Sequence, residues 1–159
     1  MRVVTRAEFP EGSLLSDRIG PGDFVDCYSV ASDKGPRRAA EIITAFPRWA
    51  RFLLRIRRAA TEPFGLSNDG PEAADKLGPF PVEVETAGEL IAGFDDRHLE
   101  FRISVLSRRG RVFLATWVQP HNLAGRLYLR AIMPFHILIA RDGLARVAAD
   151  RSGEMSDRP

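Results

Sequence analysis

Apolar and polar residues alternate along five short stretches of the chain, as they do in strands that bury one face. These stretches are residues 23–32, 80–86, 89–94, 99–107 and 111–119. No helical stretch separates the last four, and a parallel pair would need a crossover of about a dozen residues or more. The pattern therefore predicts an antiparallel sheet of about five strands.

Two short helices are predicted between the first and second strands. Pro36 opens residues 36–46 and Pro47 opens residues 47–62, because proline is tolerated in a first helical turn. In the second helix an apolar face contains Trp49, Phe52, Leu53 and Ile56. The other positions carry Arg48, Arg51, Arg55 and Arg58 and indicate a solvated helical face.

A long helix is predicted over residues 122–150, apolar nearly all round in its middle and with a kink at Pro134. A helix of this kind must be buried, and the sheet is the surface able to bury it. We therefore expect an α+β fold in which a curved antiparallel sheet wraps around a C-terminal helix. Residues 23–150 would form one domain, after an irregular lead-in over 1–22 and before a disordered tail over 151–159.

The stretch Asp95–His98 is predicted to be a four-residue turn rather than a reaction centre. That turn places Phe94 opposite Leu99 and Ala92 opposite Phe101, so that apolar residues meet on one face. Aspartate is favoured in turns because its side chain bonds the nearby backbone.

Two registers are open at the next turn, residues 108–111. A three-residue loop with Gly110 in the left-handed region would put Phe113, Ala115 and Trp117 on the same face of the sheet as Phe101. We favour this loop because a two-residue loop requires an arginine at positive φ. The two-residue alternative would put Leu114, Thr116 and Val118 there, with Arg102 opposite Trp117. Glu100 and Arg102 are expected to join a surface network in either register.

The composition is that of an ordinary soluble domain. The chain has 159 residues, a net charge of +2 and one cysteine, Cys27, so an internal disulfide is excluded. Bases and acids nearly balance, which speaks against nucleic acid as a partner. The N-terminus lacks a signal-peptide pattern, and the apolar stretch 127–140 is broken by Arg130, Pro134 and His136. We expect a cytoplasmic protein without a membrane span.

Several longer segments resemble the bacterial DUF2867 family, a domain of unknown function. They are "FPRWARFLLRIRRAATEPFGL", "GFDDRHLEFRISV", "HNLAGRLY" and "PFHILI". The order of elements is similar to that of the START-like helix-grip (SRPBCC) fold, which often holds a cavity between sheet and last helix. The resemblance also implies an oxidoreductase-like partner, because relatives of this domain follow such domains in longer chains. Ile137 stands where a basic residue is expected after "PFH".

The remaining candidates for chemistry are few. His98, His121 and His136 lack metal-ligand spacing, so we expect no metal site and no cofactor. Cys27 is interpreted as a small buried hydrophobe rather than a nucleophile.

The segment "HNLAGRLY" (121–128) is the best polar constellation. Asn122 would cap the last helix, and Gly125 would let that helix approach the sheet. Neither capping nor close packing requires His121, Arg126 or Tyr128, so these three are candidates for ligand contact. We expect the mouth of a cavity at this segment, with apolar lining from Phe94, Phe101, Ile103, Trp117, Met133 and Phe135.

Three functions remain open. The first is a binding module for a small hydrophobic or amphipathic molecule. The second is an enzyme that uses His121 or His136 as acid or base near neutral pH. The third is an interaction module for an oxidoreductase-like partner, and a homodimer is also open.

Overall fold

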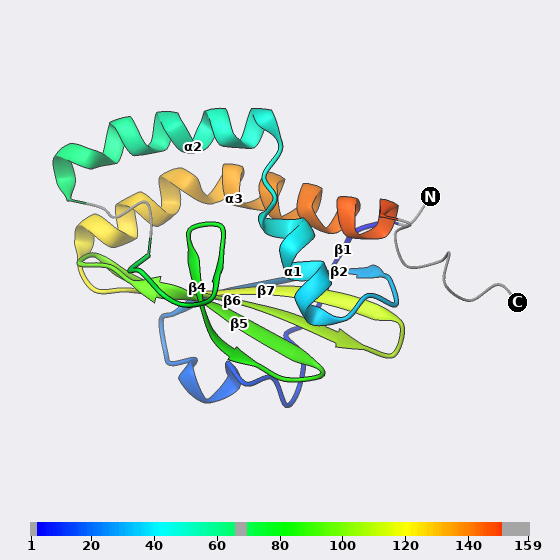
Figure 1. Ribbon diagram of the computed structural model, residues 1–159. Coiled ribbons are helices and arrows are strands. Elements are labelled where there is room, and N and C mark those ends of the chain that lie inside the picture. Colours follow the sequence, from blue (N-terminus) through cyan, green and yellow to red (C-terminus); the bar gives the residue numbers. More distant parts are fainter. Residues whose placement is uncertain (1–2, 66–69, 151–159) are drawn as a thin grey trace, which may run out of the picture.

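The computed structural model describes residues 3–65 and 70–150. Its centre is a seven-stranded antiparallel sheet in the order β1-β2-β7-β6-β5-β4-β3 (Figure 1). The strands are β1 (Thr5–Arg6), β2 (Phe24–Ala31), β3 (Lys76–Leu77), β4 (Phe80–Glu85), β5 (Glu89–Asp95), β6 (Leu99–Arg108) and β7 (Arg111–Pro120). The predicted α+β class and antiparallel sheet are confirmed. The predicted number of about five strands is too low, because β1 and β3 have two residues each and such short strands show no periodicity.

The helices are α1 (Pro36–Thr44), α2 (Arg48–Thr61) and α3 (Leu123–Ala149), with short 3-10 helices η1 (Ser16–Arg18) and η2 (Glu62–Phe64). Figure 1 shows α1 and α3 on one face of the sheet and η1 on the other, with α2 farther from the sheet than α3. Pro36 is the first residue of α1, as predicted, and Pro47 precedes α2 as its N-cap. The predicted tail, 151–159, lies outside the described residues.

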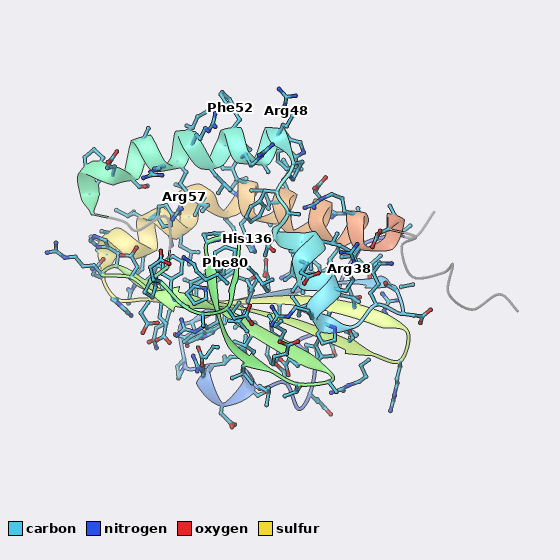
Figure 2. All side chains as sticks on the ribbon, in the orientation of Figure 1. Arg38, Arg48, Phe52, Arg57, Phe80 and His136 are labelled. Atoms are coloured by element: carbon cyan, nitrogen blue, oxygen red, sulfur yellow. The ribbon has the colours of Figure 1, made fainter. Side chains whose placement is uncertain are left out.

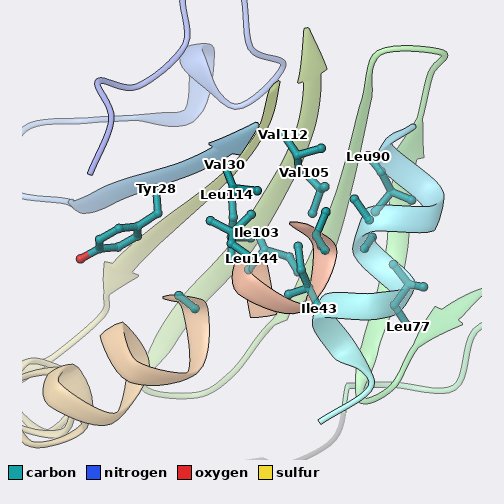
Figure 3. Packing of buried hydrophobic residues seen from close by; sticks show 14 of the residues in the cluster. Tyr28, Val30, Ile43, Leu77, Leu90, Ile103, Val105, Val112, Leu114 and Leu144 are labelled. Carbon is teal, nitrogen blue, oxygen red and sulfur yellow. The ribbon is translucent and has the colours of Figure 1, made fainter. Parts of the chain in front are cut away.

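The main core lies between the sheet, α1 and the second half of α3. Leu144 and Val147 of α3 are fully buried and belong to one cluster with Ile43 of α1 and with Ile103 and Leu114 of the sheet (Figure 3). Burial of apolar surface of this kind is the main stabilising contribution to folding.

The opposite face of the sheet is covered by the N-terminal lead-in. Leu15 is fully buried there against Ile91 and Trp117. The carboxylate of Glu89 is buried and accepts hydrogen bonds from Ser13 Oγ at 2.6 Å and from the Leu14 backbone N–H at 2.9 Å. The sequence predicts only an irregular lead-in over residues 1–22. Their described part instead adds η1, strand β1 and a second core.

The β6–β7 turn corrects the favoured register. Arg108 pairs with Arg111, and Arg109 and Gly110 both have positive φ, of 50° and 71°. This two-residue turn matches the twist of the flanking strands, and that match offsets the cost of a left-handed arginine, about 1–2 kcal/mol. Trp117 therefore lies opposite Arg102, on the lead-in side of the sheet.

The β5–β6 turn is tighter than predicted. Phe94 pairs with Phe101 and Ala92 with Ile103, and the Asp96 N–H donates to the Leu99 carbonyl at 2.8 Å. The predicted partners are two residues away from the observed ones. A shift of two keeps every side chain on its predicted face, so only the pairing was wrong.

Helix α3 is not buried along its whole length, which corrects a second expectation. Its C-terminal end packs in the core, but the helix exposes Leu123, Leu127, Phe135 and Leu138 before that point. The reason is geometric: one sheet face and α1 cover one side of the helix, and α2 touches the other side through Arg57 and Tyr128 without covering these four side chains. Within residues 3–65 and 70–150, α3 alone is long and apolar enough to cross a membrane, by length and composition.

Candidate ligand groove at the start of the last helix

Two adjoining hollows lie beside the first half of α3. The larger has a volume of about 580 Å³ and the smaller about 350 Å³, and both are lined by Gly22, Pro120 and Arg126. The larger is also lined by Phe24, Leu123, Leu127, Leu129, Arg130 and Met133, and the smaller by Pro21, Asp23, Gln119 and His121. Because they share residues, we treat them as one site and call it the α3 groove.

One wall of the groove is the loop before β2. Gly22 has a φ of 82°, which glycine adopts without strain. Asp23 holds this loop against β7: its carboxylate accepts hydrogen bonds from the Gly20 N–H at 2.8 Å and from the indole N–H of Trp117 at 2.9 Å. The wall is thus fixed to the sheet before any ligand arrives.

The opposite wall is the start of α3. Asn122 caps the helix as predicted, with its Oδ1 accepting a hydrogen bond from the Gly125 N–H at 2.9 Å. A Cβ on Gly125 would lie 2.2 Å from the carbonyl oxygen of His98, so the predicted close approach is also confirmed. His98 is structural, since its Nε2 lies 3.0 Å from the carbonyl oxygen of Phe64.

The groove is cationic. Arg126 and Arg130 are one helical turn apart on the exposed side of α3, and neither forms an ion pair within the described residues. No Asp or Glu occurs in the sequence between Glu100 and Asp142. The one carboxylate that lines the groove, Asp23, is bonded to Gly20 and Trp117. An acidic group entering the groove would therefore meet two guanidinium groups that are not engaged in an ion pair among the described residues.

A histidine–aspartate pair lies next to Phe24, one of the residues that line the groove. His136 Nε2 is 2.9 Å from Asp26 Oδ2, and the His136 ring meets the Phe24 ring edge-on at 6.3 Å between centroids. Phe24 precedes Asp26 by two residues on the same face of β2, and Met133 precedes His136 by about one turn of α3. Asp26 is buried, and its second oxygen, Oδ1, has no hydrogen-bond partner in the described chain.

The family model described as "Protein of unknown function (DUF2867)" matches residues 18–143. The chain belongs to the DUF2867 family. The matched range contains the whole α3 groove, together with Asp26 and His136. No curated protein and no solved structure matches the chain.

The DUF2867 chain brings some of the predicted site residues together. His121, Arg126 and Met133 line the groove, and Asn122 caps the helix that forms it. His136 does not line the groove but contacts Phe24, which does.

Other predicted site residues lie elsewhere. Trp117 is buried on the opposite face of the sheet, and Phe135 is exposed to solvent on α3, so neither lines the groove. Phe101 packs on Phe80 with 5.4 Å between ring centroids, and Ile103 belongs to the main core. The apolar lining predicted from Phe101, Trp117 and Phe135 is therefore corrected to Phe24, Leu127 and Met133.

Tyr128 links two helices instead of lining the groove. Its hydroxyl accepts a hydrogen bond from Arg57 Nε of α2, and the Arg57 guanidinium lies 5.3 Å from the centre of its ring. Burial raises the pKa of Tyr128. Figure 2 shows Arg57 on the side of α2 that faces α3.

Cys27 is unsuited to nucleophilic chemistry. Burial, reinforced by the adjacent Asp26 carboxylate, raises the pKa of Cys27 to about 12, so the thiolate is scarce near neutral pH. Among the described residues no three His, Cys, Asp or Glu side chains gather in a way that would hold a metal ion.

Sequence reasoning missed Gly22, Phe24, Asp26 and Arg130. Arg130 had a signal, because it follows Arg126 by four residues on a helix and so shares its face. The other three come from a loop and strand about a hundred residues away in the chain, and no local pattern joins them to α3.

Proposed function

We propose that this DUF2867 domain binds an amphipathic, acidic small molecule in the α3 groove. The observation that carries the proposal is the pair Arg126 and Arg130, unpaired within the described chain, beside the apolar side chains of Phe24, Leu127 and Met133. The guanidinium groups would bind a carboxylate or phosphate, and the apolar side chains would contact the body of the ligand.

The size and position of the groove support this assignment. A volume of about 580 Å³ lies within the range of small-molecule sites, roughly 300–1,000 Å³. The N-terminal end of α3 carries a partial positive charge of the same sign as the two arginines. An acidic head group would gain from both, whereas a neutral analogue would gain from neither.

We also propose that the fold is the helix-grip arrangement, on the basis of its topology. Strand β2 is followed by two helices, then by the strands β3 to β7 in order along the sheet, with β7 returning beside β2. Helix α3 then crosses the face of the sheet. In this chain the groove opens beside the first half of α3, near the start of β2, instead of lying within the packed core.

The test is a titration with an acid and its neutral counterpart, decanoate and decanol, against three folded variants. Arg126→Gln and Arg130→Gln should each weaken decanoate binding about tenfold, or about 1.4 kcal/mol, and leave decanol binding unchanged. Arg141→Gln, on the same helix but away from the groove, is the matched control and should change neither. Equal losses for acid and alcohol would refute the assignment.

A second candidate function is proton transfer by His136, supported by its 2.9 Å contact with Asp26. The Asp26 carboxylate would accept a hydrogen bond from the Nε2–H of His136. The Nδ1 atom of that tautomer carries the lone pair and would act as the general base. The probe is 4-nitrophenyl decanoate, whose hydrolysis needs a base to take a proton from water as it attacks the ester carbonyl. His136→Gln should abolish hydrolysis while decanoate binding persists. Unchanged hydrolysis in that variant would exclude this role.

A further inference from the structure

The outer face of α2 is apolar, exposed and uncovered in the described chain. Trp49, Phe52 and Ile56 have 38%, 62% and 51% of their surfaces exposed. The buried residues of the helix are Ala50 and Thr61, and Arg57 contacts Tyr128 of α3. Figure 2 shows Phe52 and Arg48 on the side of α2 that points away from α3. The helix thus presents large apolar side chains to its surroundings instead of to the core.

These apolar residues form a continuous band. At about 100° per residue, Trp49, Phe52 and Ile56 fall within a sector of roughly 60°, extended on both sides by Ala59 and Ala60. A second sector, beside the first, carries Arg48, Arg51, Arg55 and Arg58, all exposed. We call the two sectors together the α2 outer face. It is amphipathic on its exposed side, which a helix that only covers a core does not need to be.

The charge on this side of the molecule is segregated. No Asp or Glu occurs between Glu41 and Glu62, so the arginines of the α2 outer face have no acidic neighbour on their own helix. Those four arginines form no ion pair within the described residues. Acidic side chains lie on the sheet, where Glu83 and Asp95 pair with Arg102. The net charge is only +2, but the charge is unevenly distributed, with a cationic helical side and a largely neutralised sheet.

We propose that the α2 outer face binds the surface of an anionic lipid membrane. Phe52, Ile56 and Trp49 would enter the boundary between head groups and acyl chains, and the arginines would lie among the anionic head groups. A helix of 14 residues is about 21 Å long and can lie flat in that boundary. A second copy of the chain fits this face less well, because pairing would bring the two arginine rows together.

The first test is co-sedimentation of the full chain with vesicles of phosphatidylcholine, with and without phosphatidylglycerol. Binding should require phosphatidylglycerol and fall with added salt. Arg51→Gln with Arg55→Gln should weaken it at least about tenfold, whereas the charge-matched control, Arg6→Gln with Arg97→Gln, should leave it within about twofold. Phe52→Ser with Ile56→Ser should weaken vesicle binding by a similar factor. The control pair, Leu14→Ser with Val84→Ser, lies away from the α2 outer face and should leave vesicle binding unchanged.

Tryptophan fluorescence supplies a readout in the unmodified protein. Trp49 lies on the proposed contact face, whereas Trp117 is already buried on the opposite side of the sheet, with 2% of its surface exposed. Anionic vesicles should shift the emission of Trp49 to shorter wavelength and protect it from acrylamide, and Trp49→Phe should remove the shift.

Three results would overturn the proposal. The first is that the wild-type chain does not sediment with phosphatidylglycerol vesicles. The second is that both variant pairs bind as well as their controls. The third is that a single-stranded oligonucleotide or a second copy of the chain binds through the same residues while vesicles do not. None of these outcomes bears on decanoate binding in the α3 groove, so the two proposals fail independently.

Discussion

Gly125 lies so close to His98 that a β-carbon at position 125 would sit 2.2 Å from the His98 carbonyl oxygen. The same oxygen accepts a hydrogen bond from the His121 N–H at 2.8 Å. This contact joins the start of α3 to the β5–β6 turn and so sets the angle at which the helix leaves the sheet. The shape of the α3 groove depends on that angle.

We therefore predict that Gly125→Ala destabilises the protein and deforms the groove. Backbone atoms cannot yield as a flexible side chain would, so the free energy of unfolding should fall by about 1–3 kcal/mol. Gly88→Ala is the control, because its new β-carbon would lie 4.0 Å from its nearest neighbour. Urea denaturation measures both, and equal stability of the two variants would show that α3 is not held in this position.

Leucines on opposite sides of α3 should differ in their contribution to stability. Leu144→Ala should cost about 2–5 kcal/mol, because the side chain is fully buried in the main core. Leu138 is 54% exposed, and Leu138→Ala should stay within about 0.5 kcal/mol. A large loss for Leu138→Ala in the same denaturation experiment would mean that something covers this side of α3.

Glu89 should control attachment of the N-terminal lead-in. In Glu89→Ala the hydroxyls of Ser13 and Ser104 and the Leu14 N–H lose their buried acceptor. The free energy of unfolding should fall by about 3 kcal/mol. Limited proteolysis should also cut the lead-in sooner than in the wild type. The control is Glu85→Ala, whose exposed ion pair with Arg37 should contribute less than about 1 kcal/mol. Unchanged proteolysis of Glu89→Ala would contradict the role of this carboxylate.

The protein should lose stability in alkaline solution, because the Cys27 thiol loses its proton more readily in the unfolded chain. The folded chain raises the pKa of Cys27 from 9.0 to about 12, so the unfolded chain loses this proton first as the pH rises. The stabilisation is complete below pH 9 and is lost progressively between pH 9 and pH 12. From pH 8 to pH 10 the wild type should lose about 1 kcal/mol more than Cys27→Ala. Parallel curves for the two proteins would show that the thiol is not buried.

Local patterns in the sequence were sufficient to predict most elements. Alternation identified the strands around Cys27, Val84, Ile91, Ile103 and Ala115, because strands that bury one face repeat every two residues. Proline and asparagine marked helix starts at Pro36 and Asn122, since their effects act within one turn of the chain.

The side of the sheet on which Trp117 lies could not be predicted with the same success. It depends on whether the β6–β7 turn contains two residues or three, and a change of one residue reverses every side chain on the strand. The decision rested on Arg109, whose left-handed conformation costs little compared with the packing that it permits. Strand pairing over the whole length of β6 and β7 outweighed a local preference.

The sequence by itself determined which residues form strands and helices and that α2 and α3 each have apolar faces, because these properties depend on neighbours within a few positions. Only the tertiary structure decided which faces point outward. Trp49, Phe52 and Leu138 are apolar yet exposed, since the sheet and α1 cover one side of α3 and little of α2. It also decided that Asp26 and Phe24 lie beside His136 and Met133, because such a contact depends on the path of the whole chain between them.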